Sequence, residues 1–141
     1  MRGHTLVELT FILLLMGVAV ASVAPTARKA RDRAAVAAAR EAVVGLLAET
    51  RVAAIEAGGA SAWIDSGSGL AEALARGTTL RRLSLTTDFG VRLELSGGQP
   101  RVELRYDALG LGRMTSITIV FSRGAAAAGL VVSSYGRVRR T

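Results

Sequence analysis

The chain opens on a long apolar segment. Residues 9–27 contain no charged side chain, and residues 11–21 (FILLLMGVAVA) are apolar apart from Gly17. As a helix, this uncharged segment spans about 28 Å, close to the roughly 30 Å hydrocarbon core of a bilayer. The pattern predicts a transmembrane helix.

The helical pattern continues beyond the apolar segment. Residues 27–57 contain 12 alanines, one glycine and no proline, a composition with high helix propensity. One helical face is apolar, at Val36, Val43, Leu47 and Ala54, and the charged residues Glu41, Glu49, Arg51 and Glu56 lie mostly elsewhere. Gly58 and Gly59 predict the helix end. The result is one helix of about 50 residues, too long for a compact domain, so its first half must project.

After Gly59 the pattern changes to short segments of period two, separated by glycine-rich turns. Strands are predicted over residues 60–65, 80–86, 91–95, 102–106, 116–121 and 130–134. Residues 70–76 (LAEALAR) are predicted to form a short helix or turn, and residues 96–100 (SGGQP) a hairpin turn. We therefore expect an α+β fold, in which a long N-terminal membrane-anchoring helix packs against a C-terminal antiparallel β-sheet head.

Composition argues against an enzyme. The chain has 141 residues, a net charge of +7 and no cysteine, which excludes disulfides, cysteine-ligated zinc and thiol catalysis. Its single histidine, His4, lies at the extreme N-terminus, so a Ser-His-Asp triad and a histidine-rich metal site are excluded. The aspartates Asp65, Asp88 and Asp107 lie near predicted turns, where Asp usually caps backbone groups. We expect no catalytic residue, no metal and no cofactor.

Three interpretations of the apolar segment compete. A cleaved secretory signal would use Ala19-Val20-Ala21 for signal peptidase, but Glu8 immediately ahead of the apolar run has no role in such a signal. A plain anchor would place the C-terminal part in the cytoplasm, because the basic residues Arg28, Lys29, Arg31 and Arg33 follow the span. The third interpretation is a specialised membrane stem.

The N-terminal motif favours the stem. The run from Gly3 to Leu9 (GHTLVEL), followed by the apolar segment, resembles the type III signal of type IV prepilins and type II secretion pseudopilins. The resemblance implies that prepilin peptidase cleaves between Gly3 and His4 and methylates the new amine of His4, where the family usually has Phe. It implies a leader (residues 1–3), a transmembrane stem (4–27), a soluble stem (28–58) and a β-rich head (59–141).

The same resemblance gives Glu8 a role in assembly. After cleavage Glu8 is the fifth residue, and its carboxylate would pair with the free amine of a neighbouring subunit. An unpaired charge in an apolar filament core is expensive, so the pair would set the register of the next subunit. The implied partners are other pilins or pseudopilins, prepilin peptidase and the inner membrane, which the chain would cross once with its head in the periplasm.

The C-terminal half narrows the resemblance. The segments VELRYDALGLGR, SITIVF and GLVVSSYGRVRR are similar to the GspH/FimT group of minor pilins and pseudopilins. This implies a minor subunit at the tip of a type II secretion pseudopilus or a type IV pilus, with a structural and not a catalytic role.

The number and placement of the arginines support an alternative function. Residues 60–141 hold 11 arginines against six acidic residues, and residues 136–140 are Gly136-Arg137-Val138-Arg139-Arg140. In an extended strand, Arg137 and Arg139 share one side and lie about 6.5–7 Å apart, which matches the phosphate spacing of a nucleic-acid strand, while Arg140 points to the other side. The run resembles the Gly-Arg-x-Arg motif of FimT-type pilins that bind DNA in natural transformation, which makes Arg137, Arg139 and Arg140 candidate DNA contacts. Because aromatic residues are scarce, such binding would be independent of sequence.

Overall fold

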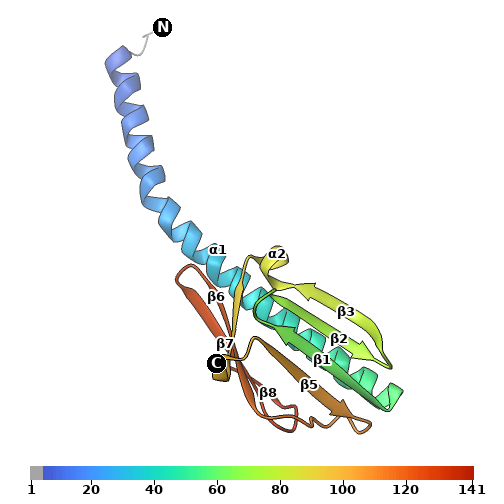
Figure 1. Ribbon diagram of the computed structural model, residues 1–141. Helices are drawn as coiled ribbons and strands as arrows, with labels where there is room; N and C mark the ends of the chain where they lie inside the picture. The colour runs from blue at the N-terminus through green and yellow to red at the C-terminus, as the bar shows by residue number, and fades with distance from the viewer. Residues whose placement is uncertain (1–4) are drawn as a thin grey trace.

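The computed structural model describes residues 5–141, apart from the side chains of residues 21–23. Its dominant element is α1 (Leu6–Ala57), a helix of 52 residues whose first half projects away from the rest of the molecule (Figure 1). Thr5 caps its start, and Gly58 ends it in a left-handed conformation with φ 80°. The predicted long helix and its stop at Gly58–Gly59 are confirmed.

The first sheet has four antiparallel strands in the order β3-β2-β1-β5. Their bounds are Gly59–Asp65 for β1, Leu70–Ala75 for β2, Thr78–Ser84 for β3 and Arg101–Asp107 for β5. A two-residue turn joins β2 to β3, with Arg76 at φ 51° and Gly77 at φ 77°. Positive φ at both turn residues matches the twist of the two strands, so this hairpin is tight.

The second sheet also has four antiparallel strands, in the order β4-β6-β7-β8. Their bounds are Arg92–Leu95 for β4, Ile117–Arg123 for β6, Ala126–Val132 for β7 and Val138–Arg140 for β8. A short helix, α2 (Leu85–Phe89), lies between β3 and β4, and the 3-10 turn η1 (Ser96–Gly98) lies between β4 and β5. Both sheets pack on the second half of α1 (Figure 1), so the predicted α+β class is confirmed.

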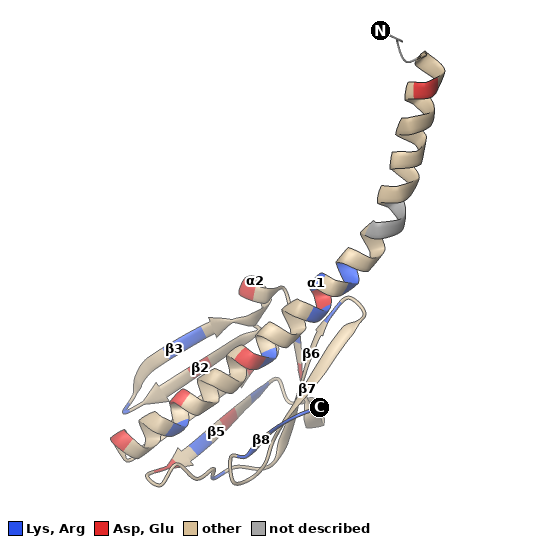
Figure 2. Cartoon of the chain, turned by 180° about the vertical axis from the view of Figure 1, so that it is seen from behind, with Lys and Arg blue, Asp and Glu red and all other residues tan. Residues whose placement is uncertain are grey.

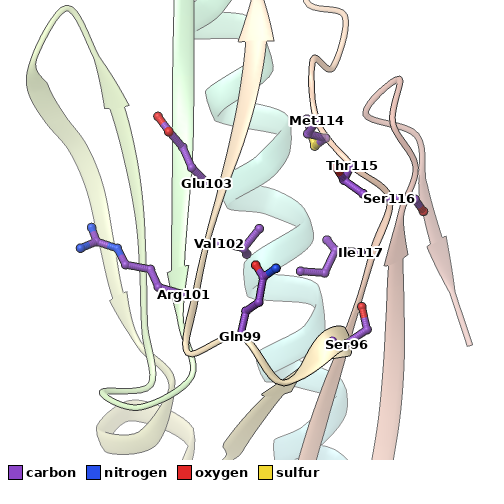
Figure 3. A pocket seen from close by; sticks show the side chains of 10 residues that line it. Ser96, Gln99, Arg101, Val102, Glu103, Met114, Thr115, Ser116 and Ile117 are labelled. Carbon is purple, nitrogen blue, oxygen red and sulfur yellow. The ribbon is translucent and has the colours of Figure 1, made fainter.

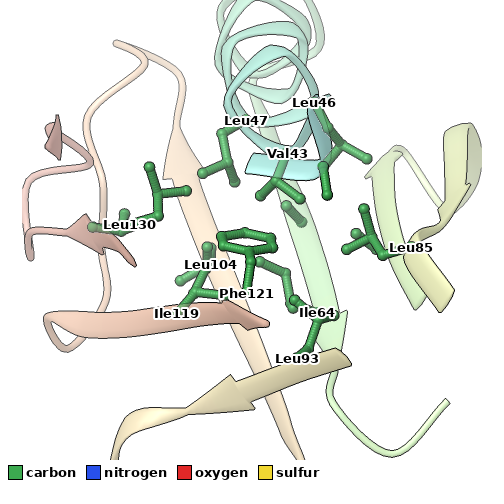
Figure 4. Close-up of a cluster of buried hydrophobic side chains, with 14 of the residues drawn as sticks. Val43, Leu46, Leu47, Ile64, Leu85, Leu93, Leu104, Ile119, Phe121 and Leu130 are labelled. Carbon is green, nitrogen blue, oxygen red and sulfur yellow. The ribbon is translucent and has the colours of Figure 1, made fainter. Parts of the chain in front are cut away.

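The core lies where the helix meets both sheets. Phe121 of β6 is fully buried at its centre, beneath Val43 and Leu47 of α1 (Figure 4). Around it lie buried aliphatic side chains from the first sheet, the second sheet and α2: Ile64, Leu104, Leu93, Ile119, Leu130 and Leu85. The four apolar positions predicted to share a helix face (Val36, Val43, Leu47 and Ala54) are all buried.

Two predicted elements differ in the structure. Residues 70–75 form the strand β2 and not a helix or turn, because Ala71, Ala73 and Ala75 alternate inward and are small enough to face α1 closely. The strand predicted over residues 80–86 ends at Ser84, whose side chain caps α2 by accepting the Thr87 N–H at 3.4 Å. Tertiary packing and a local cap override the propensity of the segments.

The turn at residues 96–100 does not close a hairpin. It joins β4 to β5, which belong to different sheets, since β4 pairs with β6 and β5 pairs with β1. Gly97 (φ 83°) and Gly98 (φ 67°) do redirect the chain, as the glycines indicated. Turn residues show that a chain changes direction, but they do not show which strand it pairs with next.

Leu47 provides a test of the core. It is 2% exposed on α1, whereas Val52, further along the same helix, is 56% exposed. Leu47→Ala should lower the free energy of unfolding by about 2–5 kcal/mol, because a cavity is left between α1 and the sheets. Val52→Ala is the matched control and should change it by less than about 1 kcal/mol. Denaturant unfolding of the full chain in detergent, followed by the fluorescence of Trp63, measures both; equal losses would contradict this core assignment.

Candidate functional site

The first half of α1 is a bare apolar rod. Its large apolar side chains between Leu6 and Val20 are all exposed, from 44% for Ile12 to 79% for Leu6. Nothing else among the described residues covers it (Figure 1), and the helix is long and apolar enough to cross a membrane. An apolar surface of this size requires lipid or other helices around it.

Glu8 lies at the outer end of this rod. It occupies the first turn of α1, where its N–H donates to the Thr5 carbonyl at 3.0 Å and approaches the Thr5 hydroxyl at 3.4 Å. A carboxylate in the first turn interacts favourably with the helix dipole. Its neighbours Leu6, Val7 and Leu9 are exposed apolar residues, so Glu8 is an acidic residue beside exposed apolar side chains. The predicted cleavage and methylation residues, Gly3 and His4, lie outside the described residues.

Three ion pairs hold the head to the second half of α1. Asp32 pairs with Arg123 of β6, with Oδ1 and Nε 3.0 Å apart, and Glu49 pairs with Arg81 of β3. The third pair joins Glu41 to Arg140 of β8. Acidic residues of the helix therefore engage arginines from both sheets, at points spread along its length (Figure 2).

The Glu41–Arg140 pair is bidentate. Arg140 Nε and Nη2 donate to the two carboxylate oxygens of Glu41 at 2.8 and 2.7 Å. These hydrogen bonds from Arg140 hold the pKa of the Glu41 carboxyl below its ordinary value of 4.5, and Arg40 lowers it further. Arg140, predicted as a candidate DNA contact, is thus engaged in attaching the last strand to the stem helix.

The other two C-terminal arginines have a different environment. Arg139 lies opposite Val131 in the ladder, and the Arg137 carbonyl accepts the Ser133 N–H at 2.9 Å. Arg139 thus lies within β8, whereas Arg137 immediately precedes β8 and faces Ser133, the residue that follows β7. Both side chains are exposed, and within the described chain neither forms an ion pair. Arg137 also lines a pocket of about 330 Å³ beside α1, together with Arg51 and Tyr106.

Close backbone contacts position this C-terminal segment. Gly112 donates its N–H to the Tyr135 carbonyl at 3.0 Å, and a Cβ built on Gly112 would overlap the backbone nitrogen of Gly136. Asp107 organises the preceding loop by accepting the N–H groups of Leu111 and Leu109 at 3.0 and 2.9 Å. These hydrogen bonds, of which the one from the Leu111 N–H has the largest effect, lower the pKa of Asp107 below its ordinary value of 3.8. Asp107 thus has a structural role, as predicted for aspartates near turns.

On the outer face of the first sheet, arginine and glutamate side chains form ion pairs with one another. Arg105 pairs with Glu103 at 2.7 Å and Arg82 pairs with Glu72. Between these pairs, the guanidinium of Arg101 lies 4.1 Å from the ring centroid of Trp63. Cation–π contact of this kind holds an arginine against the sheet surface. The arginines of this face are already engaged within the sheet.

No group of three or more His, Cys, Asp or Glu side chains in residues 5–141 is placed to hold a metal ion. Of the predicted site residues that the structure describes, Arg137 and Arg139 are exposed, Arg140 is bound to Glu41, and Glu8 lies at the far end of the helix. Sequence reasoning missed the pairing of Arg140 with Glu41. No spacing signal could have found it, because the two residues are 99 positions apart.

A projecting apolar helix whose second half is packed under an antiparallel β head defines a pseudopilin-like class of fold. No family model and no curated protein matches the sequence. Among solved structures, the chain is similar to the minor pseudopilin EpsH from the type 2 secretion system of Vibrio cholerae, with a TM-score of 0.55 and 17% sequence identity. The match covers 74% of this chain and 93% of EpsH. The chain has the fold of a minor pseudopilin.

The ion pair between β8 and α1 makes stability depend on pH. Because the folded-state pKa of Glu41 is lowered, its contribution is fully present above about pH 4.5 and is lost as the pH falls through the lowered value. Glu41→Gln should therefore lower the melting temperature at neutral pH and have little effect under acidic conditions where the carboxyl is protonated. Glu56→Gln, also exposed on α1, is the control and should show no such pattern. A Glu41 variant whose loss does not shrink as the pH falls below 4.5 and the carboxyl becomes protonated would contradict the pairing.

Proposed function

We propose that this protein is a minor pseudopilin-type subunit, which assembles at the tip of a type II secretion pseudopilus or a type IV pilus and has a structural role. The observation that supports this most directly is the division of α1. Its first half exposes apolar side chains all round, while its second half is the inner layer of a folded head. One helix thus joins a membrane or filament core to a head outside it.

The proposal includes a path to assembly. Prepilin peptidase cleaves between Gly3 and His4, and the amine of His4 is the site of methylation. Residues 4–27 remain in the inner membrane until the subunit joins the filament, and the head lies on the periplasmic side. The exposed apolar surface of α1, which lipid covers before assembly, is covered by the helices of other pilins afterwards.

In this proposal Glu8 is the assembly contact. Glu8→Ala should leave membrane insertion intact or improve it, because a carboxylate near the apolar segment is costly in lipid. Incorporation into the filament should fail, because the amine of the neighbouring subunit loses its partner. Fractionation of membranes and sheared filaments, with detection of the subunit in each, measures both effects.

Thr5→Ala is the matched control, since it removes the cap of α1 but keeps the carboxylate. It should reduce incorporation much less than Glu8→Ala does. If both variants fail equally, the defect lies in the start of the helix and not in the charge. Normal incorporation of Glu8→Ala would contradict the role of Glu8.

A second candidate function is DNA binding by the C-terminal arginines. It is favoured by the environment of Arg137 and Arg139, which are exposed and unpaired within residues 5–141, while Arg81, Arg82, Arg105, Arg113, Arg123 and Arg140 are in ion pairs. Arg51 lies beside Arg137 in the same pocket and adds to the positive potential. Such a surface suits phosphate contacts without base readout, as in DNA uptake.

Changing Arg137 and Arg139 together to Gln tests this second function. The full chain in detergent should bind duplex DNA with micromolar or weaker affinity at physiological salt, and the double variant should flatten the salt dependence by about two phosphate contacts. Arg33 and Arg92, which are also exposed and without an ion pair in the described structure, form the charge-matched control pair. Titrations at several salt concentrations measure the slopes. Equal losses in both double variants would indicate general charge attraction, and no binding at low salt would exclude the function.

A further inference from the structure

The outer edge of β5 is open over a short length. On its inner side β5 pairs with β1 along all seven residues. On its outer side the loop after β5 covers only one end, where the Arg113 N–H donates to the Arg105 carbonyl at 2.8 Å and the Asp107 N–H donates to the Leu111 carbonyl at 3.0 Å. Residues 101–104 have no strand beside them on that side.

The direction of the open backbone groups follows from these bonds. In an antiparallel ladder, the N–H and C=O of successive residues point alternately to one side and the other. The backbone groups of Arg105 and Asp107 point to the outer side. Arg101 and Glu103 lie an even number of residues away, so their N–H and C=O groups also point outward. Within the described residues, no hydrogen bond is made to the backbone N–H or C=O of either residue on this side. Two donors and two acceptors are therefore aligned on an open edge.

This edge is one wall of a cavity of about 490 Å³. The opposite wall is the segment that leads into β6, with Met114, Thr115 and Ser116 (Figure 3). Val102 and Ile117 point toward one another across the space, while Arg101 and Glu103 point away from it (Figure 3). The bond from the Thr118 N–H to Ser96 Oγ, at 3.0 Å, links the β6 segment to the turn that bounds the other end.

The size of the cavity matches a short strand. One residue in a sheet occupies about 160 Å³, from a rise of about 3.3 Å, a strand spacing of about 4.8 Å and a layer spacing of about 10 Å. The volume therefore holds about three residues, and the open edge offers backbone bonds at Arg101 and Glu103, which are two residues apart. Because this cavity has walls on both sides and one covered end, the edge of another folded sheet cannot enter it.

We propose that this cavity binds a short extended segment of a partner polypeptide, which adds to β5 as a further strand of the first sheet. Backbone pairing with Arg101 and Glu103 provides the affinity. The side chain opposite Val102 enters the space between Val102 and Ile117, so it must be a small apolar one such as valine. Its two neighbours lie on the outer face among charged side chains, and they are polar. Nucleic acid does not fit this edge, because Arg101 and Arg105 are already engaged with Trp63 and Glu103.

The probe is the blocked peptide acetyl-Ser-Thr-Val-Thr-Ser-amide, titrated into the full-length chain in detergent micelles. Amide signals in NMR spectra measure the affinity and the exchange rate of each N–H with solvent. Saturable binding in the millimolar range should slow the exchange of the Glu103 N–H at least threefold. The Leu104 N–H, which points toward β1, should be slow without peptide and unchanged with it.

Two variants separate backbone pairing from side-chain contact. Glu103→Pro removes the outward N–H at an edge position where proline is tolerated, and it should weaken binding about fivefold or more. Glu103→Ala keeps the N–H but loses the ion pair with Arg105, and it should change the affinity less than twofold. Cooperative unfolding followed by Trp63 fluorescence checks that both variants fold.

A modified peptide tests the proposal even if Glu103→Pro does not fold. The same peptide with N-methyl groups on the valine and on both threonines cannot donate an N–H to β5 in either strand direction, and it should bind the unaltered chain at least fivefold more weakly. Equal binding of the methylated peptide would overturn the proposal, as would equal binding by Glu103→Pro and Glu103→Ala. The proposal would also be overturned if about 10 mM peptide did not slow the exchange of the Glu103 N–H. This result does not depend on whether the chain assembles into filaments.

Discussion

Burial of one face of α1 between residues 36 and 54 is the constraint on which the rest of the structure depends. Each sheet is a single layer, and neither could cover its own apolar face without the helix. Phe121 from one sheet and Ile64 and Leu104 from the other meet beneath Val43 and Leu47. Since the same helix continues into the exposed apolar half, the fold of the head also fixes the direction in which that half leaves it.

Charge distribution follows from this arrangement. The head is rich in arginine, and the helix supplies Asp32, Glu41 and Glu49 as partners for arginines of both sheets. Exposed pairs contribute little individually to stability, but those on three different strands restrain where the sheets lie along the helix. At the C-terminal end of the described head, Arg137 and Arg139 are exposed and have no such partner among residues 5–141.

Much of this architecture was readable from the sequence. The apolar run, the alanine-rich continuation and the glycine stop define α1, because helix periodicity and termination are local properties. Strands with clear alternation were also located, but β2 was not, since LAEALAR has helical propensity and becomes a strand only against α1. The sequence did not show which strands pair, for the same reason. Gly97 and Gly98 turn the chain, but the pairing of β5 with β1 depends on how the core packs. The open edge of β5 depends on that pairing and had no signal in the sequence.

The attachment of β8 to α1 has a consequence for the order of events during synthesis. Arg140 of β8 pairs with Glu41 of α1, which lies 99 positions earlier in the chain. The helix therefore leaves the ribosome long before the strand that completes the second sheet. Contacts at such sequence separation form late and slowly. The apolar half of α1 is therefore synthesised in full before the head can close, so its surface is available to lipid or to other helices while the head is still incomplete.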